Sequence, residues 1–237
     1  MTAALRVGGL VPLTTLDFPD HLACVLFCQG CGWRCRYCHN PQLIPACGNE
    51  ERPWSEILAF LEQRVGLLEA VVFSGGEPTL QTALPEAIAQ VRALGYKVGL
   101  HSAGIKPKLF AGILPLVDWV GFDVKALPEQ STAITGVDGS GKANWRSLEH
   151  LLESGVEHEC RTTVHWQLFD ADSLWEMAQR LRRLGWWRGD RRRRGDRPRR
   201  ARHRRQGARG PRLVRRRQPA PGADHPDGRA GSGRRIA

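Results

Sequence analysis

Apolar and polar positions alternate in a regular pattern between about residues 23 and 184. Short, continuous apolar runs are typical of buried strands. Five such runs occur, at residues 23–28, 70–74, 97–101, 118–124 and 159–166. After each run, apolar residues recur at helical spacing, and Pro or Gly marks several of the boundaries. This pattern predicts helices over residues 53–65, 85–95, 108–114, 145–154 and 172–184.

Strands that alternate with helices through short connections form a parallel sheet, because each crossover returns the chain to the same edge. Five or six such units fall short of the eight that close a full barrel. We therefore predict the α/β class, with an open, partial (β/α)6-type TIM barrel. Ligand sites in such folds lie at the carboxyl ends of the strands, so the segments that follow the strands are the first places to search.

The composition changes after Gly185. Residues 1–185 hold 16 Lys and Arg against 20 Asp and Glu, whereas residues 186–237 hold 19 Arg against 4 Asp. The net charges of −4 and +15 account for the +11 of the whole chain, so the basicity belongs to the last segment. We predict a folded domain over residues 1–185 and a disordered Arg-rich, Gly/Pro-rich tail over residues 186–237.

Two interpretations of this tail remain open. An Arg-rich segment can bind nucleic acid through phosphate contacts. The same composition also results when a GC-rich gene is translated out of frame, and the change falls directly after a well-formed helix, where another strand is expected. We favour the frameshift, so nucleic acid is an expected partner only if the tail is native.

The rest of the composition indicates a cytoplasmic protein that does not bind a membrane. No signal peptide precedes the domain, and no apolar run approaches the roughly 20 residues of a membrane span. Seven cysteines, three of them within eight positions, suit a metal or cluster site better than a disulfide framework.

Cys31, Cys35 and Cys38 follow the first predicted strand in a C-x3-C-x2-C arrangement. Three thiolates can hold three irons of one [4Fe–4S] cluster and leave the fourth iron open. That iron would bind the amino and carboxylate groups of S-adenosylmethionine (SAM). The alternatives are a zinc site or buried free thiols. The other cysteines lack cluster spacing and are predicted to be structural: Cys24, Cys28, Cys47 and Cys160.

A second motif, Gly75-Gly76-Glu77-Pro78, ends the strand predicted at residues 70–74. Two glycines at a strand end would allow backbone to approach a ligand with no Cβ in the way. Carbonyl groups and the Glu77 carboxylate would then accept hydrogen bonds from an ammonium group. By itself, such a segment is also an ordinary turn.

Together, the cysteine spacing and the Gly-Gly-Glu-Pro segment 37 residues later resemble the signature of the radical SAM superfamily. The resemblance implies a barrel of the radical SAM kind, Tyr37 packed near the SAM adenine, and residues 75–78 at the SAM amino group. Later strand ends supply the other residues that it assigns to SAM binding: Ser102, Asp123, Lys125 and Arg161. The sequence His101-Ser-Ala-Gly104 departs from the Asp-Thr-Asn-Gly that glycyl-radical activases often show.

The opening Gly8-Gly-Leu-Val-Pro-Leu-Thr-Thr-Leu-Asp-Phe-Pro-Asp20, with Cys38-His-Asn-Pro41, resembles activating proteins of anaerobic ribonucleoside-triphosphate reductases over about residues 6–185. Pyruvate formate-lyase activases are close relatives. The resemblance implies an oxidoreductase that makes a 5′-deoxyadenosyl radical and abstracts a glycine Cα hydrogen on a glycyl radical enzyme. A flavodoxin or ferredoxin would supply the electron. Alternatives are a small-molecule radical SAM enzyme, such as a carboxy-deazaguanine synthase, a non-catalytic iron–sulfur or nucleic-acid-binding protein if the tail is native, or an activase damaged by the frameshift.

Overall fold

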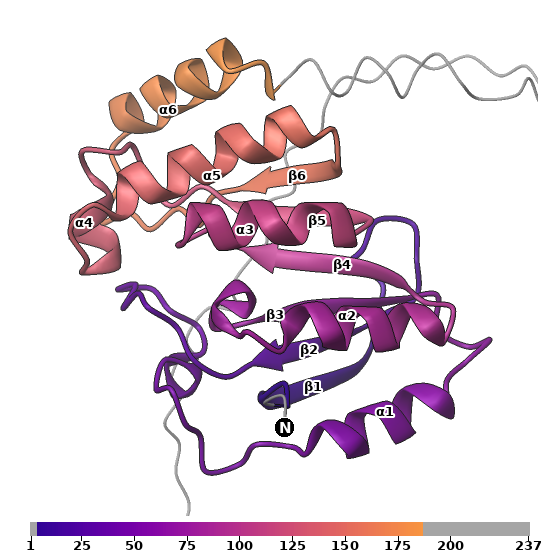
Figure 1. Cartoon of the computed structure of the whole chain (residues 1–237). Helices are drawn as coiled ribbons and strands as arrows, with labels where there is room; N and C mark the ends of the chain where they lie inside the picture. The colour runs from indigo at the N-terminus through magenta and orange to yellow at the C-terminus, as the bar shows by residue number, and fades with distance from the viewer. Residues whose placement is uncertain (1–3, 187–237) are drawn as a thin grey trace, which may run out of the picture. The chain divides into compact units, whose positions relative to one another are not determined.

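The computed structural model of the chain describes residues 4–186, and these form an α/β fold around one six-stranded sheet. The strands lie in chain order across the sheet (Figure 1). The first strand is antiparallel to the second, and all later neighbours are parallel. The predicted open, partial barrel is confirmed. The strands are β1 (Val7–Thr14), β2 (Ala23–Cys28), β3 (Ala70–Gly75), β4 (Lys97–Ser102), β5 (Trp119–Asp123) and β6 (Glu157–Arg161).

Six α-helices of the described residues connect or follow the strands, and α2, α3 and α5 lie along one face of the sheet in Figure 1. The main apolar core lies between this face and the helices, because alternate strand residues point toward them. Cys24 and Cys28 belong to this core, as predicted. The helices are α1 (Trp54–Glu62), α2 (Leu84–Ala93), α3 (Pro107–Ile113), α4 (Ser131–Thr135), α5 (Ser140–Ser154) and α6 (Ala171–Arg183).

The opposite face of the sheet carries a smaller apolar cluster. Phe18, from the loop between β1 and β2, packs there against Val25, Val72 and Trp119. Its ring comes so close to β4 that a Cβ on Gly99 would lie 2.9 Å from it. The opening segment that resembles the activases therefore fills this face near the amino ends of the parallel strands.

The structure corrects several predicted boundaries. Strand β1 was not predicted because Gly8, Gly9 and Pro12 hide its pattern, although Pro is tolerated at a sheet edge. The last strand spans Glu157–Arg161 rather than 159–166. Helix α1 ends at Glu62, so Val65 is exposed instead of joining its apolar stripe.

Two further differences occur beside the predicted site. Helix α4 was missed, because five residues are too short for a helical period to emerge. Helix α5 starts at Ser140, five residues before its predicted start at Trp145, and polar or small residues fill its first turns. Both differences matter for function, since α4 and the start of α5 contact the segments that follow β2, β4 and β5.

The predicted tail lies outside the described residues except for Trp186, so its predicted disorder and its origin remain predictions. Among the helices of residues 4–186, none combines the length and the apolar character needed to cross a membrane.

Candidate cofactor site

The predicted cluster ligands lie on a loop, Cys31–Cys38, that leaves the carboxyl end of β2. Backbone hydrogen bonds tie this loop to α4, because the N–H groups of Arg34 and Arg36 donate to the carbonyls of Thr135 and Ile134, each at 2.9 Å. The loop is therefore held by an element more than 90 residues away in the sequence.

The Cys31 and Cys35 thiols are partly buried against an apolar cluster centred on Trp33, whereas Cys38 is exposed. Burial raises the pKa of Cys31 to about 11. Burial also raises the pKa of Cys35, and the Lys125 ammonium opposes this shift. Within residues 4–186, no three His, Cys, Asp or Glu side chains are already arranged as a metal site. Cluster binding would require the three thiols to lose their protons and turn toward a common centre.

Gly75 and Gly76 bring the end of β3 against the chain that enters the cysteine loop. Gly75 has a φ of +113°, and a Cβ there would lie 2.3 Å from the Cys28 nitrogen. A Cβ on Gly76 would lie 2.2 Å from the Gly30 carbonyl oxygen. The N–H of Gly76 donates to Cys28 O and that of Glu77 to Gly30 O, both at 2.9 Å. The space without Cβ atoms, which we expected to admit a ligand, is thus occupied by neighbouring backbone.

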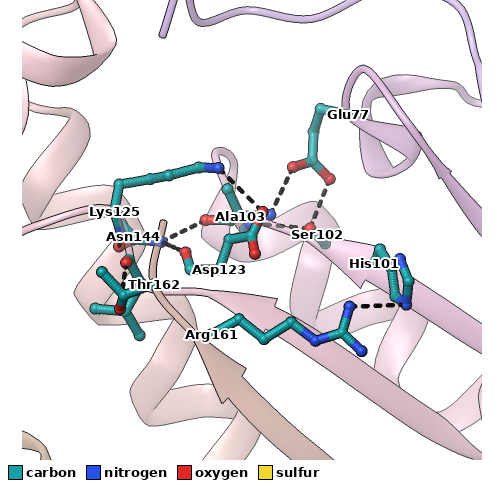
Figure 2. A network of polar contacts seen from close by, with 11 residues as sticks. Glu77, His101, Ser102, Ala103, Asp123, Lys125, Asn144, Arg161 and Thr162 are labelled. Carbon is teal, nitrogen blue, oxygen red and sulfur yellow. Dashed lines mark hydrogen bonds and ion pairs between the residues drawn. The ribbon is translucent and has the colours of Figure 1, made fainter. Parts of the chain in front are cut away.

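Glu77 is 2% exposed and lies at the centre of a hydrogen-bond network (Figure 2). Its Oε1 accepts from the hydroxyls of Ser102 (2.6 Å) and Thr79 (2.7 Å), and its Oε2 accepts from the Ala103 N–H (3.1 Å). Burial raises the pKa of Glu77, and these donors act in the opposite direction because they favour the carboxylate. Several donors converge on this carboxylate from two strand ends, so it has a fixed position.

Ser102 was predicted to contact SAM, but its hydroxyl already has two partners in the structure. It donates to Glu77 and accepts from the Gly104 N–H at 2.9 Å. The side chain is 4% exposed. These contacts fit a residue that orients Glu77 better than one that contacts a ligand directly.

Asp123 and Lys125 form an ion pair at the end of β5, with 3.0 Å between Nζ and Oδ2. The Lys125 ammonium also lies 5.8 Å from the centre of the Tyr37 ring. Burial lowers the pKa of Lys125, but Asp123 and the neighbouring Cys35 and Tyr37 outweigh this effect and raise it overall. This lysine therefore remains charged beside the cysteine loop.

The Tyr37 hydroxyl is buried and has no hydrogen-bond partner among residues 4–186. Burial raises its pKa to about 12, so it stays protonated and can donate. A buried donor without a partner costs about 1–3 kcal/mol, which a bound ligand can recover. Together with soft thiol donors next to it, this hydroxyl fits a site for an iron–sulfur cluster and a polar organic ligand.

Arg161 shares a register position with Asp123, but its guanidinium extends along the sheet toward the amino ends of the strands. It lies 3.2 Å from the His101 Nε2 and 5.2 Å from the Trp119 ring. Figure 2 shows Arg161 joined to His101 and apart from the Lys125–Asp123 pair. The structure therefore brings Tyr37, Asp123 and Lys125 together and leaves Arg161 in a separate cluster.

Asn144 on α5 is a buried member of the network that sequence reasoning missed. Its amide hydrogen-bonds to the carbonyls of Ala103 and Asp123 and to the N–H of Lys125. One signal was available in the sequence, since Asn144 lies on the same helical face as Leu148 and Leu151. A polar residue on an apolar stripe must find partners when it is buried.

These features define a class before any comparison: a partial β/α barrel whose strand ends carry a three-cysteine loop beside a buried carboxylate network, a Lys–Asp ion pair and a buried tyrosine hydroxyl. A family model described as the radical SAM superfamily matches residues 25–185. The chain belongs to the radical SAM superfamily. It is accordingly an enzyme whose cofactors are a [4Fe–4S] cluster and SAM.

Two relatives match most of the chain. A protein of Methanocaldococcus jannaschii, provisionally named a glycyl-radical enzyme activating enzyme, is 27% identical over 183 residues, which cover 74% of this chain and 75% of the relative. The pyruvate formate-lyase-activating enzyme of Clostridium pasteurianum is 32% identical over 175 residues, with 70% and 71% covered.

The fold is also similar to that of solved structures. SuiB of Streptococcus suis, in its structure bound to the precursor peptide SuiA, superposes with a TM-score of 0.51 at 15% identity. The match covers 66% of this chain and 35% of SuiB. At this identity the similarity concerns the barrel alone.

Proposed function

We propose that the chain activates a glycyl radical enzyme, and specifically an anaerobic ribonucleoside-triphosphate reductase. The observation that carries the proposal is the match of two activating enzymes to 70% or more of the chain. The opening segment and Cys38-His-Asn-Pro41 favour the reductase as the partner. The Clostridium relative supports pyruvate formate-lyase as the second candidate.

In the proposed site, Cys31, Cys35 and Cys38 would hold the cluster. With SAM bound, the cluster would supply the one-electron chemistry that makes a 5′-deoxyadenosyl radical, for abstraction of a glycine Cα hydrogen on the partner. The chain's own task is therefore to orient SAM and to admit the partner's glycine loop.

The charged residues have complementary roles in this proposal. The methionine part of SAM carries one ammonium and one carboxylate group. The Glu77 carboxyl would accept from the ammonium, and Lys125, oriented by Asp123, would pair with the carboxylate. Tyr37 offers its hydroxyl and its ring to the adenosine part. Arg161 would need to rotate away from His101 to reach SAM.

The electron donor is proposed to be a low-potential flavodoxin or ferredoxin. Arg34 and Arg36 are exposed on the cysteine loop and carry two positive charges next to the proposed cluster. Positive groups at this position favour encounter with an acidic donor. The rate of electron delivery should therefore fall as ionic strength increases.

The test is anaerobic reconstitution followed by electron paramagnetic resonance (EPR). A reduced-cluster signal that changes shape with SAM is expected first. The loaded enzyme is then incubated with each candidate partner, and a glycyl radical signal together with one 5′-deoxyadenosine per radical is expected with the reductase. A glycyl radical on pyruvate formate-lyase alone would refute the reductase assignment. SAM cleavage that leaves no radical on either protein would refute the activase function.

A further inference from the structure

The Asn144 side chain lies at the centre of the contacts that join the ends of β4 and β5 (Figure 2). It is fully buried in the second turn of α5. Its Nδ2 donates to Ala103 O at 2.7 Å and to Asp123 O at 2.9 Å, and its Oδ1 accepts from the Lys125 N–H at 3.1 Å. Three of the four hydrogen bonds that an amide can make are therefore used on backbone groups of two strand ends.

These backbone groups belong to the two halves of the proposed SAM site. Ala103 donates its own N–H to Glu77, so its position fixes one half. Asp123 and Lys125 form the ion pair of the other half. A single side chain thus sets the spacing between the buried carboxylate and the lysine ammonium.

The start of helix α5, which carries Asn144, packs closely against the segment that follows β5. A Cβ on Gly141 would lie 2.1 Å from the Pro128 carbonyl oxygen, so the helix start is pressed against the segment after β5. The Trp145 indole N–H donates to Ala126 O at 2.8 Å. Asn144, between these two contacts, has little freedom to move away from the strand ends.

We propose that Asn144 is a positioning residue for SAM, acting through the backbone of Ala103, Asp123 and Lys125. It does not touch the ligand; it holds the Glu77 network and the Lys125–Asp123 pair at the separation that the methionine zwitterion needs. The proposal rests on the assignment of these groups to SAM, but not on the identity of the partner enzyme. Residues that hydrogen-bond to the ligands of a metal change metal affinity or activity by about 10–100-fold when they are removed, and we expect an effect of similar size on SAM affinity here.

The chain provides a matched control on the same helix. Ser147 is also fully buried and donates to the Gly104 carbonyl at 2.5 Å, but within residues 4–186 its hydroxyl makes no hydrogen bond to the end of β5. Asn144→Ala and Ser147→Ala each remove buried polar contacts to the segment after β4. Only Asn144→Ala also releases Asp123 and Lys125. Asn144→Asp keeps an acceptor for the Lys125 N–H while it removes both donated bonds.

Three measurements on the full chain test the proposal. The dissociation constant of SAM comes from a titration followed by EPR of the reduced cluster. The KM for SAM and kcat come from 5′-deoxyadenosine formation with dithionite and no partner protein. Hydrogen exchange of the Lys125 amide in the cluster-free protein reports the contact directly.

Asn144→Ala and Asn144→Asp are expected to raise the dissociation constant and KM for SAM by about 10-fold or more, with Ser147→Ala within about threefold of wild type. The Lys125 amide should lose protection in the Ala variant and keep it in the Asp variant. Equal effects of the Asn144 and Ser147 variants, or unchanged SAM affinity in both Asn144 variants, would overturn the proposal. If the Ala variant does not fold, Asn144→Asp and Asn144→Ser are judged by the same criteria.

Failure of this proposal and failure of the activase proposal give different results. If the chain binds SAM with the expected dependence on Asn144 but activates no glycyl radical enzyme, the positioning role is supported and the activase proposal is refuted. A wild-type chain that forms a cluster but does not bind SAM overturns the site assignment, and the role of Asn144 with it.

Discussion

Because the end of β3 lies so close to the segment that enters the cysteine loop, adding one methyl group at Gly76 should strongly lower the stability of the protein. In Gly76→Ala, the new Cβ would lie 2.2 Å from the Gly30 carbonyl oxygen, 2.7 Å from its carbonyl carbon and 3.0 Å from Leu43 O. All three atoms are backbone, so no side chain can rotate to make room. The two segments would have to separate by roughly 1 Å to restore ordinary contact distances.

The expected cost has two parts. Overpacking of a well-filled site costs about 1–3 kcal/mol. Separation also weakens two backbone hydrogen bonds, from Glu77 N to Gly30 O (2.9 Å) and from Gly30 N to Leu43 O (2.8 Å). Each such bond contributes about 0.5–1.5 kcal/mol. The free energy of unfolding should therefore fall by about 2–6 kcal/mol, out of the roughly 5–15 kcal/mol typical of a domain.

The assay is equilibrium unfolding of the cluster-free protein in urea, with iron content after reconstitution as a second readout. Gly112→Ala is the matched control, because Gly112 is in α3 and has no atom within 4 Å of a built Cβ. Alanine at an exposed helical position should raise stability by about 0.5–1 kcal/mol. The same chemical change is thus expected to act with opposite sign at the two sites.

One result would refute this reasoning. If Gly76→Ala unfolds at the wild-type urea concentration and binds a full complement of iron, but no longer binds SAM, then the missing Cβ makes room for the ligand and not for Gly30. Destabilisation together with reduced iron content is the expected result, because the displaced segment leads directly into Cys31.

Three further predictions concern single side chains. Burial and the Arg161 charge lower the pKa of His101 in the native state. As pH falls below about 6.5, this histidine is protonated in the unfolded chain before it is protonated in the native state, and the native state is destabilised. Between about pH 7.5 and 5.5, the free energy of unfolding should therefore fall more for wild type than for His101→Gln, by ~1.4 kcal/mol for each unit by which the pKa is lowered. Urea titrations at the two pH values measure the difference, and equal losses in both proteins would contradict this reasoning. Tyr37→Phe removes a hydroxyl that has no hydrogen-bond partner in the described part of the chain, so the free energy of unfolding of the cluster-free protein should stay the same or rise. A loss of more than about 1 kcal/mol would reveal a partner. Cys38→Ser should abolish the reconstituted cluster whereas Cys47→Ser retains it, as measured by iron content and EPR, and the reverse result would move the cluster site.

The sequence predicts strands β2 to β5 well because most of their residues are buried, on both faces of the sheet. Residues 70–73 are all apolar, because Val71 and Phe73 pack in the main core while Ala70 and Val72 pack in the cluster on the opposite face. The cysteine spacing is a signal of the same local kind, since ligands of one cluster must lie at restricted distances along the chain. Both signals are local, so one sequence is enough to detect them.

Other features depend on contacts between distant segments and leave little local trace. Strand β1 is an edge strand with Gly8, Gly9 and Pro12, and its pairing with β2 is what makes it a strand. Arg161 was assigned correctly to a strand end, but the direction of its side chain depends on His101 and Trp119 of neighbouring strands. Sequence position fixes the face of a strand and not the direction a long side chain takes along it.

For Gly75 and Gly76, the sequence indicates that another group approaches closely but does not show which group it is. Their lack of a Cβ was identified as a requirement for close approach, and the structure agrees, but the approaching group is the backbone of Cys28 and Gly30. The loop of cysteines is likewise held through the N–H groups of Arg34 and Arg36. Backbone groups are the same in every residue, so the sequence cannot show which of them meet. Asn144 is informative for the same reason, because its three hydrogen-bond partners are all backbone groups. A buried amide on the apolar face of a helix is therefore a sign in the sequence that backbone segments meet there.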